Sequence, residues 1–512
     1  MNDLVLPEGW AEAPLGELFA INPAKPMANA LAAGMPVSFV PMAALDAESG
    51  TIVSPQERTF GTVRKGYTAF ADGDVILAKI TPCFENGKAA IARELLNGHG
   101  FGSSEFHVFR PGESVIAEYL FHFLRQRSFR DDGVEHMTGT AGQARVPVEF
   151  VKATVLPVPP LAEQRRIVEQ IEALLGRANT SRERLGKLPS IVKRFRQSVL
   201  AAACAGRLTE DWRARYPKLQ VPSIPATNAR VVNARRRGAN LSGDQELLVD
   251  DEMPELPDVW TYARVDRLIE PGTVITYGIV LPGPETPRGV PYVRQQDIEN
   301  GHVLVEQLRR TSSEIASRHE RSRLQSGDVL LCIIRNLRVA VVPEGIDGAN
   351  LTQGTVRIRA RSDLLLNSFL AAYLASPQAQ GWMKRRYFGM DMPRINVEDA
   401  RAIPVALPSL EEQREIVSRI RKMFTLADAI ERRVAMSMDR ADKLVEATLA
   451  KAFRGELVPT EAELARNEGR DYEPASAVLE RLRTRSTRAQ PENRRTAGRR
   501  SNRASRSTRA SA

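Results

Sequence analysis

Polar side chains that can form several hydrogen bonds gather in short segments in both halves of the chain. In the first half these segments include Lys79-Ile-Thr81, Glu85-Asn-Gly-Lys88 and Thr138-Gly-Thr-Ala-Gly-Gln-Ala-Arg145. Arg, Lys, Asn and Gln can bond a base edge through two atoms at once, whereas Ser and Thr commonly hold phosphate oxygens. These residue types therefore predict a surface that reads nucleic acid.

The candidate DNA-contacting residues form two groups, one in each half. The first group is Lys79, Thr81, Asn86, Lys88, Ser103, Ser104, Thr140, Gln143 and Arg145. The second group is Arg294, Gln295, Gln296, Arg335, Asn336, Arg338, Thr352, Gln353 and Arg394. Turns, helix caps and solvated faces use the same residue types, so this simpler interpretation stays open at each position.

Signatures of catalysis are missing from the sequence. Asn22-Pro23 is followed by Ala24 instead of the Pro-aromatic pair of an amino methyltransferase, and no Gly-rich turn for S-adenosylmethionine is evident. Pro82-Cys83 has the dipeptide of a cytosine methyltransferase, but a buried cysteine explains it more simply. Neither a GxxxxGK[ST] phosphate loop nor HExxH-type metal spacing occurs. We therefore predict no catalytic residue, no bound metal and no cofactor on this chain.

Two long helices are predicted from a repeat. Leu161-Ala-Glu-Gln-Arg-Arg-Ile-Val returns 249 residues later as Leu410-Glu-Glu-Gln-Arg-Glu-Ile-Val. Apolar residues then recur at steps of three and four, a stripe of coiled-coil type. Pro189 interrupts the first copy, but the equivalent position of the second copy is Met438, which is compatible with a continuous helix. The comparison therefore favours one kinked helix over two separate helices in the first copy. The full-length stripes favour pairing of the two helices with each other over packing of each on its own globule.

The elements that position the polar residues form two similar globules. Short apolar runs at residues 37–40, 74–77 and 106–109 predict strands, and residues 115–126 predict a helix. Leu-Pro-x-x-Trp opens both halves, and residues 290–294 and 326–330 parallel residues 37–41 and 72–76. We predict an α+β fold with two globules separated by two long helices, which pair as an antiparallel coiled coil in a pseudo-two-fold repeat.

The predicted boundaries follow prolines, the repeat and changes in composition. They are residues 1–158 for the first globule, 159–212 for the first helical region, 213–255 for a linker, 256–406 for the second globule, 407–460 for the second helical region and 461–512 for a C-terminal segment. Basic residues occupy the start of the linker region and acidic residues its end.

Charge and cysteine content limit the class of protein. The net charge of +10 over 512 residues equals that of residues 481–512 alone, which hold eleven Arg and one Glu. This polar tail is expected to be disordered. Two interpretations of it stay open: binding of phosphates without sequence preference, and a solubilising extension with no specific role. Three isolated cysteines exclude a disulfide framework, and no secretory signal or membrane span is visible, so a cytoplasmic protein is expected.

The assembled pattern resembles the specificity subunit of a type I restriction–modification system. The resemblance rests on Leu-Pro-x-x-Trp in each half, on Leu161-Ala-Glu-Gln-Arg and Leu410-Glu-Glu-Gln-Arg, and on the Ala-Gly-Arg-Leu208 and Arg-Gly-Glu-Leu-Val-Pro459 ends. Residues 78–88 and Gly139-Thr-Ala-Gly-Gln-Ala-Arg145 are similar to loops of target-recognition domains. Phe388-Gly-Met-Asp-Met-Pro-Arg394 departs from that pattern.

The resemblance implies a non-catalytic host-defence protein that binds double-stranded DNA at an interrupted, two-part site. The helices would dock two modification subunits, which carry S-adenosylmethionine and methylate adenine. Two restriction subunits, which use ATP and Mg, would join them. The partner-binding candidates at the helix starts are Glu163, Gln164, Arg165, Glu412, Gln413 and Arg414.

Two other functions remain open at this point. A DNA methyltransferase would be revealed by methyl transfer from the isolated chain. A coiled-coil scaffold or adaptor protein without a DNA role would fail to retain a two-part duplex from a random pool.

Overall fold

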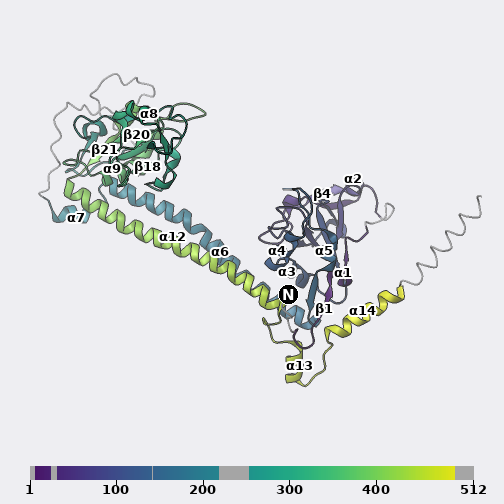
Figure 1. Cartoon of the computed structure of the whole chain (residues 1–512). Coiled ribbons are helices and arrows are strands. Elements are labelled where there is room, and N and C mark those ends of the chain that lie inside the picture. Colours follow the sequence, from purple (N-terminus) through teal and green to yellow (C-terminus); the bar gives the residue numbers. More distant parts are fainter. Residues whose placement is uncertain (1–5, 25–30, 141, 218–252, 490–512) are drawn as a thin grey trace, which may run out of the picture. The chain divides into compact units, whose positions relative to one another are not determined.

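The computed structural model describes residues 6–24, 31–140, 142–217 and 253–489. The chain divides into two compact units, Met1–Leu185 with Met436–Ala512 and Gly186–Ala435. Each unit contains one globule and a part of each of the two long helices (Figure 1).

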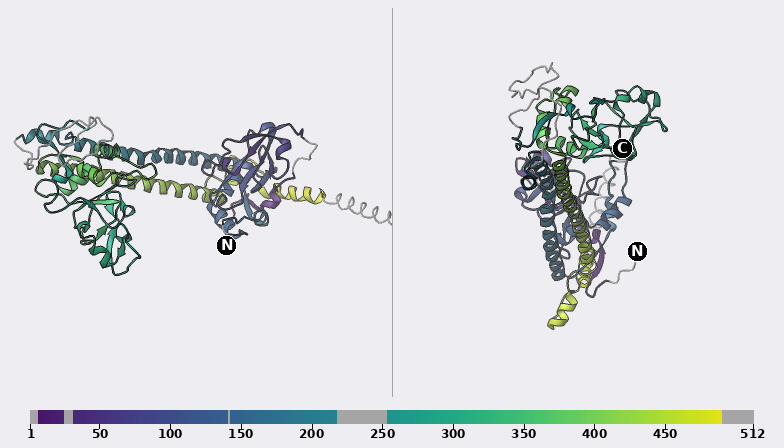
Figure 2. Two further views of the ribbon diagram at one scale, coloured as in Figure 1. Left: turned by 90° about the horizontal axis from the view of Figure 1, so that it is seen from above. Right: turned by 90° about the vertical axis from the view of Figure 1, so that its left-hand side faces the viewer.

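The long helices α6 (Leu161–Cys204) and α12 (Leu410–Phe453) have 44 residues each and lie side by side (Figures 1 and 2). In the second unit Arg196 bonds Asp428 at 2.6 Å, and Thr209, just beyond α6, bonds Glu412 at 2.7 Å. Residue numbers thus rise on one helix as they fall on the other, which confirms the antiparallel pairing. Pro189 lies inside α6, so the prediction of a single helix is also confirmed.

The first globule contains two four-stranded sheets. One has the order β2-β9-β6-β7 (Phe19–Ile21, Phe106–Pro111, Val75–Ala78 and Ala89–Ile91), with neighbours antiparallel. The other has the order β4-β3-β8-β5 (Gln56–Thr59, Pro36–Val40, His99–Gly102 and Thr68–Ala71), and β3 runs parallel to β8. Strand β1 (Ala11–Pro14) pairs with β10 (Val155–Val158) and brings the two ends of the globule together.

The second globule repeats this topology. Its four-stranded sheet has the order β12-β20-β17-β18 (Thr276–Tyr277, Thr355–Ile358, Val329–Cys332 and Val339–Val341). A three-stranded sheet has the order β16-β13-β19 (Arg309–Thr311, Val290–Val293 and Asn350–Leu351), and β11 (Thr261–Arg264) pairs with β21 (Pro404–Leu407). The hairpin β14-β15 (Ile298–Glu299 and His302–Val303) corresponds to a single antiparallel bridge between Leu45 and Ile52 in the first globule. The predicted correspondences of β3 with β13 and of β6 with β17 are confirmed.

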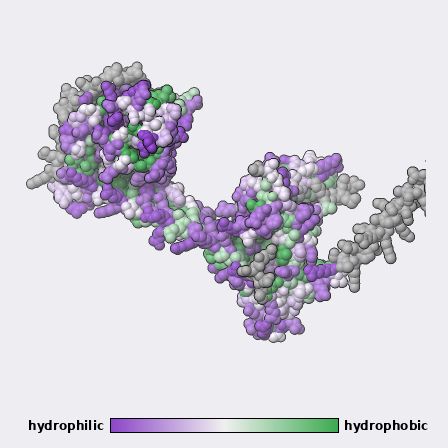
Figure 3. All heavy atoms as spheres, in the orientation of Figure 1, coloured by the Kyte–Doolittle hydropathy of each residue, from purple (hydrophilic) through white to green (hydrophobic). Residues whose placement is uncertain are grey.

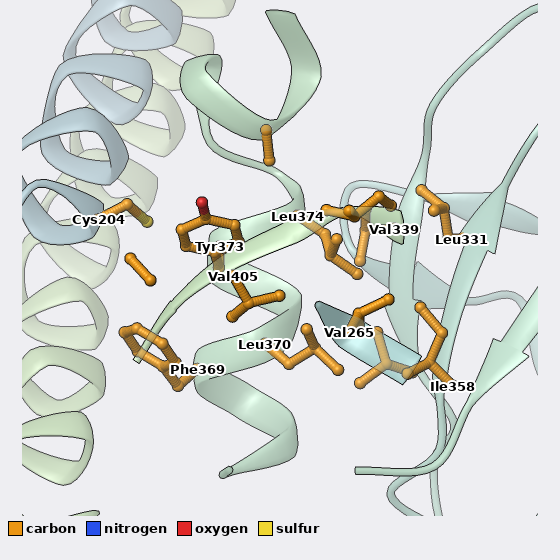
Figure 4. Packing of buried hydrophobic residues seen from close by; sticks show 14 of the residues in the cluster. Cys204, Val265, Leu331, Val339, Ile358, Phe369, Leu370, Tyr373, Leu374 and Val405 are labelled. Atoms are coloured by element: carbon orange, nitrogen blue, oxygen red, sulfur yellow. The ribbon is translucent and has the colours of Figure 1, made fainter. Parts of the chain in front are cut away.

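Each globule is attached to the long helices by one of its own helices. In the second unit, α9 (Asn367–Leu374) lies between α6 and the four-stranded sheet (Figure 4). This helix contributes Phe369, Leu370, Tyr373 and Leu374 to the core. They pack with Cys204 of α6 and with Leu331, Val339 and Ile358 of the sheet. In the first unit, Tyr119 of α3 (Ala117–Leu124) packs on Phe453 of α12, with ring centroids 4.9 Å apart. Burial of apolar side chains thus joins globule and helices in both units.

The remaining helices are short and lie on the globules or beyond the long helices. They are α1 (Leu15–Leu18), α2 (Phe60–Val63), α4 (Arg127–Glu135), α5 (Val148–Ala153), α7 (Glu210–Arg215), α8 (Ser313–Ser317), α10 (Pro377–Lys384), α11 (Val397–Ala402), α13 (Glu461–Glu468) and α14 (Ala475–Ala489). Hydrophilic and hydrophobic residues are interspersed over the visible surface of both units (Figure 3).

The prediction of disorder from residue 481 onward is wrong for residues 481–489, which belong to α14. Leu479 on this helix is buried in the core of the first unit. Arg483 and Arg485 form ion pairs with Glu17 and Glu113 of the first globule. These apolar and charged contacts stabilise a segment whose composition alone predicts disorder. The rest of the Arg-rich tail, and residues 218–252 of the predicted linker, lie outside the described residues.

Candidate DNA interface

The first group of candidate residues lies at one edge of the sheet β2-β9-β6-β7. Ala78 at the end of β6 pairs with Phe106 at the start of β9, because the two strands are antiparallel neighbours. The residues after Ala78 and before Phe106 must therefore meet at this edge, and the Lys79 amide donates a hydrogen bond to the Glu105 carbonyl at 2.9 Å. Lys79, Thr81, Ser103 and Ser104 are brought together in this way.

A hairpin formed by residues 138–145 closes over the same edge. Thr138 and Arg145 exchange backbone hydrogen bonds of 3.0 and 2.9 Å. The Thr81 amide donates to the Ala144 carbonyl at 3.0 Å, which fixes the hairpin to the segment after β6. Thr140 and Gln143 are exposed on this hairpin, so they join the edge group.

The turn between β6 and β7 carries Asn86 and Lys88. Asn86 is exposed, whereas Lys88 is half-buried and its Nζ donates to the Met42 carbonyl at 3.3 Å. Arg130 donates to the Glu85 carbonyl at 2.6 Å and supports the turn from α4. Asn86 is thus available to a ligand, while Lys88 is partly engaged within the globule.

Arg145 is held by a carboxylate within the edge group. Its Nε and Nη2 donate to Glu105 at 2.8 and 3.0 Å. The hydrogen bond from Arg145 lowers the pKa of the Glu105 carboxyl, more strongly than partial burial raises it. A phosphate or base approaching Arg145 therefore competes with Glu105.

The second group lies at the corresponding edge of the sheet β12-β20-β17-β18. Cys332 at the end of β17 pairs with Thr355 at the start of β20, as Ala78 pairs with Phe106. A pocket of about 390 Å³ opens there. Its lining is Arg294, Gln295, Gln296, Ile334, Arg335, Asn336, Arg338, Thr352, Gln353 and Gly354. All of the second group except Arg394 thus lines one pocket.

Gln295 and Arg294 form the base of this pocket. The Gln295 side-chain amide donates to the carbonyls of Ile334 at 3.0 Å and Gly354 at 2.6 Å. A Cβ at Gly354 would lie 2.7 Å from that amide, so the close approach requires glycine. Arg294 binds the buried carboxylate of Asp297 through Nε at 2.9 Å and Nη2 at 2.6 Å. Both side chains are engaged in holding the loops together.

Arg335, Asn336, Gln296 and Gln353 are exposed around the pocket. Arg335 has a φ of 60°, a left-handed conformation that is strained for a residue with a long side chain. Its amide donates to the Pro393 carbonyl at 2.6 Å, which holds the strained backbone in place. The Arg335 guanidinium forms no hydrogen bond or ion pair with any residue that the structure describes. Arg338 is also exposed, and its Nη1 donates to the Ile298 carbonyl at 2.8 Å.

Arg394 belongs to a second hairpin that matches the first. Phe388 and Arg394 exchange backbone hydrogen bonds of 3.0 Å, as Thr138 and Arg145 do. The bond from Arg335 to Pro393 corresponds to the bond from Thr81 to Ala144. The departure of residues 388–394 from the Gly-Thr-Ala-Gly-Gln pattern therefore changes the side chains and not the place of the hairpin. The repeat spacing of 249 residues relates Arg145 to Arg394 and could have revealed this match.

Four of the six partner-binding candidates are buried where a globule contacts a long helix, so they are not exposed to a partner as predicted. They are Glu163, Gln164, Glu412 and Gln413. Gln164 accepts from the Ile116 amide and donates to the Ser114 and Pro159 carbonyls, and Gln413 makes the same three contacts with Leu366, Leu364 and Pro408. Both glutamines are fully buried. Arg165 and Arg414 are exposed and remain candidates for partner contacts.

The two glutamates, Glu163 and Glu412, bind the tryptophans that open the globules. Trp10 donates to Glu163 at 2.8 Å, and Trp260 donates to Glu412 at 2.9 Å. Glu163 also accepts from the Glu461 amide, and burial raises the pKa of its carboxyl. The Leu-Pro-x-x-Trp and Glu-Gln-Arg motifs therefore form the connection between globule and helix.

The sequence did not identify the exposed apolar residues of the long helices. In the second unit Ile191 and Phe195 on α6, and Leu426 and Ile430 on α12, are 47%, 39%, 58% and 38% exposed. Each pair is spaced by four residues and so lies on one face of its helix. Apolar side chains exposed in this way are suited to a protein partner.

The described residues contain no cluster of three His, Cys, Asp or Glu side chains arranged to hold a metal ion. Burial raises the pKa of Cys204 to about 12 and that of Cys332 to about 11, so neither is an activated thiol. Cys83 is half-buried and packs on an apolar cluster of the first globule, so it is less buried than the sequence predicted. Within the described ranges, no helix combines the length and apolar composition needed to cross a membrane.

The fold and the two polar edges define a protein with two equivalent recognition modules attached to paired helices. The chain belongs to the family of the type I restriction modification DNA specificity domain, whose model matches residues 7–188 and 284–435. This match confirms the resemblance drawn from the motifs.

Relatives of known class support the assignment. The chain is 33% identical over 305 residues to the specificity subunit of the type I restriction enzyme EcoBI of Escherichia coli, a match that covers 59% of the chain and 58% of that relative. It is 26% identical over 505 residues to the EcoEI specificity subunit of the same species, covering 87% of the chain and 83% of that relative.

Solved structures share the fold. One chain from a structure on complex assembly and conformational transition of the type I R-M system has a TM-score of 0.65 at 24% identity, covering 88% of this chain and all of that one. The HsdS subunit from Thermoanaerobacter tengcongensis has a TM-score of 0.56 at 24% identity, covering 89% and 99%. The predicted fold class is thus confirmed.

Proposed function

We propose that this chain is the DNA sequence-specificity subunit of a type I restriction–modification enzyme. Each globule reads one half of an interrupted site, and neither catalyses a reaction. The observation that carries the proposal is that one sheet edge, equivalent in the two globules, gathers the polar side chains of both candidate groups. Family membership supports the same function.

The roles of individual residues differ within each edge. Arg335, Asn336, Gln296 and Gln353 reach base edges or phosphates, because they are exposed. Arg294 and Gln295 hold the loops in position. In the first globule Thr140, Gln143, Ser104 and Asn86 are the exposed contacts, and Arg145 binds DNA in competition with Glu105.

The paired helices dock two modification subunits, and two restriction subunits complete the enzyme. Exposed apolar residues on α6 and α12, with Arg165 and Arg414 at the helix starts, support a docking surface. The partner subunits, and not this chain, bind S-adenosylmethionine, ATP and Mg. The chain itself supplies recognition and positioning.

Exchange of one globule tests this function. The pairing of β11 with β21 marks where the second globule enters and leaves the helices, so residues 261–407 can be replaced by the equivalent segment of a relative. The hybrid and the native chain are each expressed with the modification subunit, and adenine methylation is mapped over the genome. We expect one half of the methylated motif to change while the other half stays.

Three results would contradict the proposal. A change in both halves would show that the globules do not read DNA independently. Methylation by the chain without its modification subunit would instead favour a DNA methyltransferase. If the chain with its modification subunit does not retain any two-part duplex from a random pool, the scaffold function is favoured.

A further inference from the structure

The hairpin of residues 388–394 presents apolar side chains where its counterpart in the first globule presents polar ones. Phe388, Met390 and Met392 are 38%, 100% and 46% exposed. Gly389 has a φ of 87°, and the Arg394 guanidinium lies over the Phe388 ring at 4.9 Å. The corresponding hairpin of the first globule carries Thr140 and Gln143 instead. Exposing methionine and phenylalanine is unfavourable in water, which favours a ligand at this tip.

The apolar tip is continuous with the polar pocket. The backbone bond from Arg335 to Pro393 and the bridge between Ile334 and Arg394 place the hairpin beside the exposed Arg335 and Asn336. On another side of the pocket, the Gln353 amide donates to the Ile279 carbonyl at 3.1 Å. The neighbouring Leu281 is 82% exposed. Hydrogen-bonding groups therefore lie between two apolar projections.

This combination of groups matches the edge that thymine presents in the major groove. Thymine offers one acceptor, O4, next to a C5-methyl group. Guanine offers two acceptors, adenine an acceptor and a donor, and cytosine a donor, all without a methyl group. A phosphate would bind to the arginines alone, so phosphate binding does not explain why the hairpin exposes methionines. The positive charges of Arg335, Arg338 and Arg394 favour DNA over a neutral or basic protein surface.

We propose that Met390, supported by Phe388 and Met392, contacts the C5-methyl group of a thymine in the half-site that the second globule reads. This inference rests on the proposed function and adds the chemical group that the hairpin recognises. The two globules then differ in the kind of readout: the second uses apolar contact in addition to hydrogen bonds, and the first hairpin uses hydrogen bonds alone.

The test replaces thymine by deoxyuridine, which removes only the methyl group. Each thymine of the recognised site is replaced singly, and the affinity of the full chain with its modification subunit is measured for every duplex. We expect at least one replacement in the second half-site to weaken binding about fourfold, the value of one buried methyl group. The Met390→Ala variant should bind the thymine and deoxyuridine duplexes equally at that position.

Matched variants separate the methyl contact from other effects. Met390→Leu keeps an apolar tip and should retain sensitivity to deoxyuridine, whereas Met390→Gln has a similar size and should lose it. Thr140→Ala alters the first hairpin and should leave the ratio at the second half-site unchanged. Because Met390 is fully exposed, its replacement should leave the thermal unfolding temperature unchanged.

The outcomes distinguish this inference from the proposed function. If the native chain prefers its site over a scrambled duplex, but no thymine replacement in the second half-site weakens binding, the methyl contact is overturned. The same holds if Met390→Ala keeps the full sensitivity. A rise in 2-aminopurine fluorescence with no deoxyuridine effect would mean that the hairpin inserts between bases, which also overturns it. No preference for any two-part site would overturn the proposed function as well.

Discussion

In both globules the sheet that carries the candidate residues has the same strand order and the same hairpin at its edge, yet the arginines are used differently. Arg145 in the first hairpin binds Glu105, at 2.8 Å, whereas the equivalent Arg394 lies over the Phe388 ring. The position of Glu105, directly before β9, is occupied in the second globule by Gly354, directly before β20. The backbone of this edge is thus the same in both globules. Single side chains next to each arginine determine whether its guanidinium group is available to bind DNA.

The absence of a side chain at Gly354 also changes what the edge can hold. Gln295 occupies the space next to this glycine and bonds two carbonyls there. The first globule has Met42 at the corresponding position after β3. Its side chain packs on an apolar cluster and forms no hydrogen bond to the edge, while its carbonyl accepts from Lys88 and from the Leu45 amide. The second edge therefore has an amide support next to Gly354, whereas the first edge has an ion pair between Arg145 of the hairpin and Glu105.

The largest expected effect concerns the feature that the globules share, the tryptophan–glutamate joint. Trp260→Ala should destabilise the second unit by about 4 kcal/mol, since it removes a buried indole and leaves Glu412 without that donor. Trp10→Ala should do the same to the first unit. Limited proteolysis with mass spectrometry, at increasing urea, would locate the unit that opens first. If both variants open the same unit, the joints are not equivalent.

The next prediction concerns the free arginine of the second pocket. Arg335→Ala should weaken binding to the recognised duplex by about tenfold to a hundredfold and relax the second half-site, because a bidentate contact to a base is worth about 1–3 kcal/mol. Arg321→Ala, an exposed arginine outside the pocket, is the matched control and should have little effect. If both variants lose the same affinity for the duplex, Arg335 contributes only its positive charge and makes no specific base contact.

A pH effect should separate the first unit from the second. Burial lowers the pKa of His122 on α3 to about 4, whereas the equivalent position on α9 is Ala372. The folded state therefore holds a neutral imidazole. Its contribution to stability is complete above pH ~6.5 and is lost as the pH falls towards 4. We expect the first unit to lose about 1 kcal/mol of unfolding free energy at pH 5.5.

The control for this prediction is His122→Ala, which matches the second globule. Urea unfolding of the full chain, followed unit by unit by hydrogen exchange, would report the slope of stability with pH. The slope of the first unit between pH 7 and 5 should shrink in the variant. An unchanged slope would mean that other groups titrate with folding.

The smallest expected effect sharpens the comparison of the arginines. Glu105→Ala should release Arg145 for a phosphate, so that binding to any duplex becomes several-fold tighter at low salt. The dependence of log affinity on log salt should steepen by about 0.9 if one phosphate contact is gained. Glu57→Ala removes an exposed carboxylate on β4 and should leave the slope as it is. Equal slopes for the two variants would show that Arg145 already binds DNA fully.

Sequence reasoning found most of the second pocket because its residues follow or precede apolar strands. Arg335, Asn336 and Arg338 come after β17, and Thr352 and Gln353 come before β20. Antiparallel strands bring such residues to one edge without further information. The same reasoning found the first group, because Lys79 and Thr81 follow β6 and Ser103 and Ser104 precede β9.

The same reasoning was wrong where burial decides the role of a polar residue. Glu163, Gln164, Glu412 and Gln413 begin helices and have the residue types of an exposed face, but all four are buried. Their partners, such as Trp10 and Trp260, lie more than 150 residues away in the chain. Periodicity describes one helix and carries no information about what packs against its first turn.

The sequence by itself determined the repeat, the two long antiparallel helices and the presence of two globules with polar loops. These features depend on local periodicity and on internal similarity, both of which are visible in the order of residues. The tertiary structure alone decided that residues 481–489 form a helix, and that Arg145 has a carboxylate partner whereas Arg394 lies over an aromatic ring. Each of these depends on contacts between distant segments, whose free energy outweighs local preference.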